Sequence, residues 1–180
     1  MRSKLLGCVL AGMLLTGCAS AIERTLTGAQ QGLAYDAYYT PTPGGDPRVL
    51  KFLEHRVEWL GIQLEYTETL DDERLQGAVG ISFRIENARY ILINGDTTIN
   101  GRLEVLAHEA AHQFQPPLGT RDEHEVFADL VAVEVCRRLG VDISQTSSRY
   151  LQAHKHAFYI VKTWKQEIAY TADLLTLRFR

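Results

Sequence analysis

The sequence is short of the features that mark specialised classes of protein. Its 180 residues include only three cysteines and five prolines, and no repeat of about 20 to 40 residues is visible, which argues against a disulfide scaffold, a collagen-like chain and a solenoid. It also lacks a long run of one charge. The 19 basic and 22 acidic side chains give a net charge of −3, without the electrostatic footprint of a nucleic-acid binder. The remaining composition, 46% apolar and 23% charged, predicts one globular domain with a sizeable core.

The first seventeen residues have the pattern of a secretory signal. Arg2 and Lys4 precede the apolar run Leu5–Leu15, which is shorter than the roughly 20 residues that span a bilayer. The closing tetrapeptide Leu15-Thr16-Gly17-Cys18 resembles the lipobox of bacterial lipoproteins, in which the cysteine is acylated and becomes the first residue after cleavage. The sequence therefore predicts a lipoprotein signal peptide at 1–17 and lipidation at Cys18. An ordinary signal peptide or an uncleaved anchor is the alternative.

Removal of residues 1–17 changes the charge and the cysteine content of the chain. The loss of Arg2 and Lys4 leaves 17 basic against 22 acidic side chains, so the 163-residue mature chain has a net charge of −5. Cys136 is then the only free thiol, which excludes a disulfide within one chain, and its apolar neighbours predict that it is buried. Residues 18–46 hold four glycines and two prolines with little periodicity. They are predicted to form a tether, and 47–180 to form the folded domain.

The hydrophobic periodicity of residues 47–180 changes from helical to strand-like and back. Asp46-Pro47 is typical of a helix N-terminus, and apolar residues three and four apart follow it until about Gly61. Two segments with alternating apolar residues come next, and Asn87-Ala88 has the pattern of a hairpin turn into a third strand. The predicted elements are a helix at 47–61, strands at 62–67, 79–85 and 89–94, and helices at about 100–115, 122–139 and 147–172. This order predicts an α+β fold: an N-terminal helix, a three-stranded meander and three further helices.

The residues with the clearest chemistry lie in the helix predicted after the third strand. His108-Glu109-Ala110-Ala111-His112 is an H-E-x-x-H motif. Because residues four apart share one helical face, both imidazoles can bind one metal ion while Glu109 leans over the open coordination position. We expect the motif on the side of the helix opposite its apolar stripe. The spacing predicts one catalytic Zn²⁺ per chain, with His108 and His112 as ligands.

A third ligand is required, and the residues after His112 decide its source. A metzincin would have Gly and His where this chain has Gln115 and Leu118, so that class is excluded. Glu125 and Asp129 share one face of the next predicted helix, so Glu125 can bind the metal while Asp129 accepts the second N–H of a ligand histidine. Two neighbours of Glu125 stay open as alternative third ligands. They are Glu123 and His124.

The order of these motifs resembles the small gluzincin metallopeptidases, especially the ImmA/IrrE family. The resemblance covers about residues 62–139. It rests on a strand that ends in Ile93-Asn94, on Leu106-Ala107 before the H-E-x-x-H motif, and on the pattern E-x-x-A-D-x-x-A that starts at Glu125. Two features depart from the family: Ala111 stands where members usually have Gly, and members are mostly cytoplasmic, whereas this chain has a lipoprotein signal. The second departure argues against transferring the family's intracellular substrates to this chain.

The motifs and the resemblance together predict zinc-dependent hydrolysis of peptide bonds by a minimal zincin-like domain. With zinc on His108, His112 and Glu125, the Glu109 carboxylate would take a proton from water and pass it to the leaving amine. Zinc can polarise the oxyanion, and the resemblance implies that a His or Tyr, here of the last predicted helix, can add to this stabilisation. The candidates are Tyr150, His154, His156 and Tyr159.

These predictions describe a lipid-anchored enzyme of the bacterial cell envelope that acts on a peptide or protein substrate. The alternative is a membrane-tethered binding or scaffold domain that keeps a zinc site without turnover. Glu109 discriminates between the two, because a structural zinc site has no need of that carboxylate and usually closes its fourth position with a protein ligand.

Overall fold

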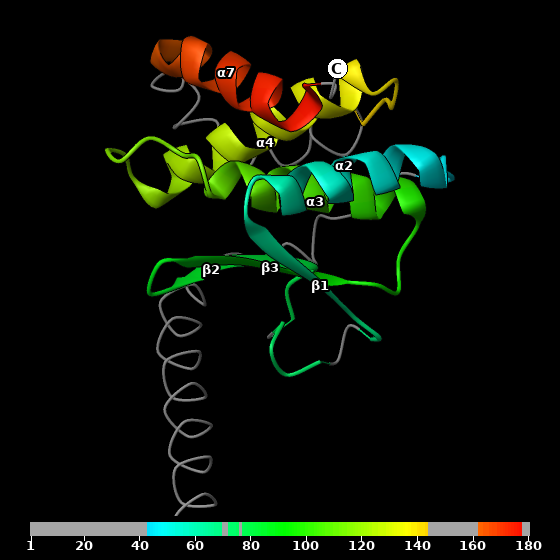
Figure 1. Ribbon diagram of the computed structural model, residues 1–180. Helices are drawn as coiled ribbons and strands as arrows, with labels where there is room; N and C mark the ends of the chain where they lie inside the picture. The colour runs from blue at the N-terminus through cyan, green and yellow to red at the C-terminus, as the bar shows by residue number, and fades with distance from the viewer. Residues whose placement is uncertain (1–42, 70–71, 76, 144–161, 178–180) are drawn as a thin grey trace, which may run out of the picture.

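The computed structural model of the chain describes residues 43–69, 72–75, 77–143 and 162–177 (Figure 1). Helix α2 (Pro47–Trp59) leads into strands β1 (Ile62–Thr67), β2 (Gly80–Ile85) and β3 (Ala88–Asn94). These are followed by helices α3 (Ile99–His112) and α4 (Arg121–Arg138), the 3₁₀ helix η2 (Lys162–Trp164) and helix α7 (Lys165–Thr176). The predicted α+β class is therefore confirmed. None of the helices in these ranges combines the length and the apolar character that a membrane span needs.

The three strands form a mixed sheet in the order β1-β3-β2, so the predicted meander is wrong. Strands β2 and β3 are an antiparallel hairpin, whereas β1 runs parallel to β3. The physical reason lies in β3, whose run Ile91–Asn94 is buried at every position, whereas β1 alternates and only the first residue of β2 is buried. A continuously buried strand has apolar contacts on both faces and belongs in the centre of a sheet.

The hairpin turn lies one residue earlier than predicted. It is formed by Glu86 and Asn87 rather than by Asn87 and Ala88, because Ala88 already pairs with Ile85. Glu86 takes up the left-handed conformation, with φ of 54°. Such a conformation is uncommon for a side chain other than Gly, Asn or Asp, which is why the turn pattern in the sequence pointed to Asn87.

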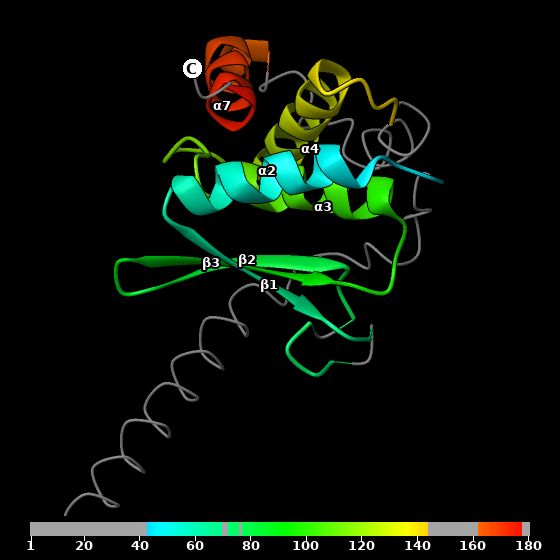
Figure 2. The same ribbon diagram turned by 45° about the vertical axis from the view of Figure 1, so that its right-hand side comes forward.

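The helices form layers on one face of the sheet. Helices α2 and α3 lie side by side over the sheet, and α4 and α7 lie on the far side of α3 (Figures 1 and 2). Helix α3 is thus enclosed by β2, β3, α2 and α4. Its residues from Leu103 to Ala111 are all buried, which places α3 at the centre of the hydrophobic core.

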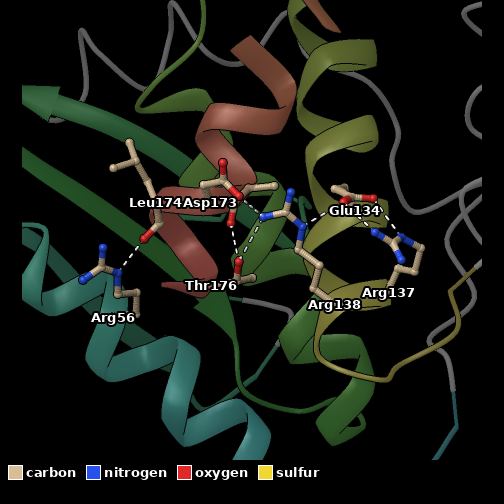
Figure 3. Close-up of polar contacts among 8 residues, drawn as sticks. Arg56, Glu134, Arg137, Arg138, Asp173, Leu174 and Thr176 are labelled. Carbon is tan, nitrogen blue, oxygen red and sulfur yellow. Dashed lines mark hydrogen bonds and ion pairs between the residues drawn. The ribbon is translucent and has the colours of Figure 1, made fainter. Parts of the chain in front are cut away.

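Polar contacts hold the C-terminal end of α7 against both of its neighbours (Figure 3). From α2, the buried Arg56 donates a hydrogen bond to the backbone carbonyl of Leu174. From α4, Arg138 binds the Asp173 carboxylate and, at 3.2 Å, the Thr176 hydroxyl. A cation at the last carbonyls of a helix complements the helix dipole. Helix α7 ends at Thr176, beyond the predicted end at Ala172, and residues 147–161 of that predicted helix lie outside the described ranges.

Candidate metal centre

Helix α3 brings the two histidines of the motif onto one face. The helix begins where the Thr98 hydroxyl accepts a hydrogen bond from the Gly101 N–H at 2.9 Å, and it continues to His112. The Nε2 atoms of His108 and His112 lie 3.1 Å apart, and the two rings meet edge to face with their centroids 4.8 Å apart. Both imidazoles therefore present the same nitrogen to one point in front of the helix.

Helix α4 adds a carboxylate to this point. The helix starts in a capping box, in which the Thr120 hydroxyl accepts a hydrogen bond from the Glu123 N–H and the Glu123 carboxylate accepts one from the Thr120 N–H. Two residues further on, the Oε2 atom of Glu125 lies 3.4 Å from the Nε2 of His108 and 3.7 Å from the Nε2 of His112. His108, His112 and Glu125 are thus a group that could hold a metal ion.

The two alternative third ligands have other contacts. Glu123 belongs to the capping box. His124 points its Nε2 at the carbonyl of Pro116, 3.1 Å away, and stacks on Trp164 with ring centroids 6.0 Å apart. Of the three neighbouring candidates on α4, the structure brings only Glu125 into the group with the two motif histidines.

The spacing of the three donor atoms fits a tetrahedral metal ion. Zinc with ligands at about 2.0 to 2.1 Å separates any two of its ligand atoms by about 3.3 Å. The observed separations of 3.1, 3.4 and 3.7 Å scatter around this value. The His108 side chain is only 4% exposed, whereas those of His112 and Glu125 are 18% and 16% exposed. The group is therefore open to solvent on the side of His112 and Glu125.

The second nitrogen of each histidine has an oxygen partner. His108 Nδ1 lies 2.8 Å from the Asp129 carboxylate, as the one-turn spacing of Glu125 and Asp129 led us to expect. His112 Nδ1 lies 2.9 Å from the Oε1 of Gln115. An acceptor at Nδ1 holds the proton there and leaves Nε2 free to bind a metal. The role of Gln115 was missed in the sequence, although it follows His112 by three residues.

The electrostatics of the group favour a cation. Burial disfavours the charge on Glu125, but hydrogen bonds and positive charge from the two histidines outweigh burial and hold the pKa of its carboxyl well below the ordinary value. Burial likewise acts against protonated His108 and His112, yet their carboxylate neighbours raise both imidazole pKa values. The negative charge that raises these imidazole pKa values would equally favour a bound metal cation.

Glu109 lies beside the metal-ligand group and against the first residue of β2. Its side chain is nearly buried, and burial raises the pKa of its carboxyl. A Cβ atom on Gly80 would lie 2.4 Å from Cγ1 of Val105 and 3.0 Å from Cγ of Glu109. Only glycine therefore allows β2 to approach the motif helix this closely. Gly80 was not among the predicted site residues, and its signal in the sequence is a glycine at the start of an alternating strand.

The side of α3 that carries the motif is buried rather than exposed to solvent. His108 and Glu109 are buried, like Leu106 and Ala110 around them, although Glu109 keeps 8% of its surface exposed. The reason is that α4 covers the side of α3 that a single amphipathic helix would expose to solvent. The sequence of α3 shows one apolar stripe, which predicts one buried side, whereas α3 has neighbours on several sides.

Several predicted residues lie outside the described ranges, including Cys18 and the four candidates for oxyanion stabilisation. These four are Tyr150, His154, His156 and Tyr159. Cys136 is buried in the core, as predicted, and burial raises the pKa of its thiol.

Comparisons of this chain with family models, with curated proteins and with solved structures each find no match. The fold and the site by themselves define an α+β domain with a partly buried His-His-Glu group that could hold a metal ion.

The ligand group is tested by replacing one histidine inside it and one outside it. His112→Ala removes one of three ligands, so we expect the zinc content to fall from about one ion per chain to nearly none. His124→Ala removes a ring from the same region without touching the group, and we expect it to keep zinc. Zinc content after dialysis, with circular dichroism as a check of folding, measures both. Stoichiometric zinc in folded His112→Ala would contradict the ligand assignment.

Proposed function

We propose that this protein is a zinc-dependent metallopeptidase that hydrolyses peptide bonds. The observation that carries the proposal is the combination of a three-ligand group with a nearly buried glutamate beside it. Catalytic zinc sites keep one position open for water or substrate, whereas structural sites use four protein ligands. Among the described residues, the group of His108, His112 and Glu125 has no fourth such ligand.

The chain's own residues supply orientation and proton transfer. Zinc, when bound, supplies the Lewis-acid chemistry that activates water and polarises a carbonyl. Asp129 and Gln115 orient the two ligand histidines through their Nδ1 atoms. Glu109 accepts a proton from the attacking water and then donates it to the leaving amine. Its raised pKa suits this exchange, because a general base works best when its pKa is close to the working pH.

The position of β2 supports a peptide as the substrate. Among the described strands β2 pairs with β3 alone, so its other edge has backbone groups that no described strand occupies. The strand is held against α3 at both ends, by the Gly80 contact with Glu109 and by a 2.7 Å hydrogen bond from Arg84 to the carbonyl of Gln113. An extended peptide can add to such an edge through main-chain hydrogen bonds. Strand β2 would then hold the substrate backbone beside Glu109.

The resemblance to the ImmA/IrrE metallopeptidases also supports the proposal. Ala111, where that family usually has Gly, is fully buried, so a small side chain is accommodated at this position. With the lipoprotein signal at 1–17, we infer that Cys18 anchors the enzyme in a membrane of the bacterial envelope and that its substrate is a peptide or protein there.

The proposed role of Glu109 predicts that replacing it abolishes catalysis without affecting zinc binding. In Glu109→Gln the three ligands are intact, so zinc content should stay at about one per chain. Peptide cleavage should fall by at least about 100-fold, because the amide cannot transfer the proton. Terminal proteomics of cells that carry either form, followed by a peptide assay on the substrates found, measures the change. An unchanged cleavage rate would exclude this mechanism and favour a zinc domain without turnover.

The contact between Gly80 and Glu109 leads to a second prediction. Gly80→Ala places a methyl group against Val105 and Glu109 and should displace the glutamate, with peptide cleavage reduced by about 100-fold and zinc content unchanged. Gly140→Ala is the matched control. Gly140 has φ of +79° and nothing within 4 Å of an added Cβ, so this change strains the backbone without crowding the site. Equal losses of activity in the two variants would refute a specific role for Gly80.

Membrane anchoring is tested through the two cysteines of the N-terminal region. The native chain should incorporate labelled palmitate and sediment with membranes, and Cys18→Ser should do neither. Cys8→Ser changes the other cysteine, inside the proposed signal peptide, and should behave like the native chain. Absence of the label from the native chain would rule out acylation at Cys18.

A further inference from the structure

A second glutamate of α3 is buried behind the metal-ligand group. Glu104 precedes His108 by one helical turn and is only 2% exposed. Its Oε2 atom is buried and has no hydrogen-bond partner among the described residues. A buried carboxylate oxygen without a donor is costly, and the cost favours a neutral carboxylic acid, which can itself donate a hydrogen bond.

The neighbours of Glu104 place it at the interface of α3 and α4. His108 and His112 both lie near Glu125, but of these two histidines only His108 contacts Asp129, one turn further along α4. An earlier position on α3 therefore faces a later position on α4, so the two helices run antiparallel. Glu104, one turn earlier on α3, interacts electrostatically with both Asp129 and Cys136. Asp129 and Cys136 are seven residues apart, which is about two turns of one face of α4. The antiparallel arrangement therefore places Glu104 near Asp129, on the side away from the ligands.

The surrounding charges favour the neutral form of Glu104. Burial, followed by the negative charge of Asp129, raises the pKa of its carboxyl to about 8, against a smaller opposite effect of His108. The other titratable neighbour, Cys136 on α4, is itself held neutral because burial raises the pKa of its thiol. A neutral carboxylic acid next to a carboxylate can donate its proton to that carboxylate in a hydrogen bond, as in paired carboxyl groups that share a proton.

We propose that Glu104 is a positioning residue for the metal ligand His108, and that it acts by donating its carboxyl proton to Asp129. Asp129 would then be held from two sides, by the Nδ1–H of His108 and by Glu104. The inference rests on the metal site of the proposed function but not on peptide hydrolysis. It adds a third member to the pair of His108 and Asp129 that orients the imidazole.

The test compares two replacements of Glu104 by zinc affinity, measured by chelator competition at pH 6.5. Glu104→Gln is neutral and keeps a donor, so we expect its zinc affinity to stay within about threefold of the native value. Glu104→Leu keeps the volume but removes the donor, and we expect affinity to fall about tenfold or more, as for the loss of other outer partners of metal ligands. Urea unfolding of the metal-free proteins should show Glu104→Leu to be as stable as the native chain or more so. A merely structural role predicts the reverse: Glu104→Leu would keep native zinc affinity but lose stability against urea.

A second measurement needs no metal. In the metal-free protein, the proton resonance of His108 Nδ1–H reports its hydrogen bond to Asp129, and it should shift in Glu104→Leu but not in Glu104→Gln. Failure of the metal site itself would leave this result unaffected. Cys136→Ala is the matched control, because it alters packing beside Glu104 and removes no donor to Asp129. Native zinc affinity in Glu104→Leu, an equal loss in Cys136→Ala, or an equal loss in Glu104→Gln would each overturn the proposal.

Discussion

The contact between α3 and α4 at the pair of His108 and Asp129 is the interaction on which the rest of the site depends. Both side chains are buried, and Nδ1 lies 2.8 Å from the carboxylate. Breaking such a pair leaves a buried charge without compensation, so the two helices are held at one relative position. That position brings Glu125 within 3.4 Å of His108. The metal-ligand group therefore follows from the orientation of one imidazole.

The enclosure of α3 requires small side chains on the motif helix. Ala107, Ala110 and Ala111 are completely buried, and short side chains allow the sheet and α4 to approach the helix axis. Gly80 has the same function on the strand side, where even a methyl group would collide with Val105 and Glu109. Close packing on all sides explains how His108 and Glu109 stay buried in a domain of this size. It also leaves little exposed surface on the inner side of the site, where electrostatic interactions are correspondingly stronger.

Much of the fold could be read from periodicity, because helices and strands bury their faces at different intervals. The predicted helix at 122–139 is α4 shifted by one residue, and the strand predicted at 62–67 is β1. The order of the strands could not be read in this way. It depends on which strand can be covered on both faces at the smallest desolvation cost. Strand β3 lies at the centre because its apolar run is continuous. Glu86, in turn, occupies a conformation for which its residue type provides no signal.

The sequence by itself determined which residues could bind a metal. The one-turn spacing of His108 and His112 directs both imidazoles to one point, and the same spacing of Glu125 and Asp129 allows one carboxylate to join them while the other holds a histidine. Only the tertiary structure decided that Glu125, rather than Glu123 or His124, faces the histidines. It alone placed Gly80, Gln115 and Glu104 around the site. The physical reason is that spacing along a helix sets the direction of a side chain, whereas its partners on other elements are set by how those elements pack.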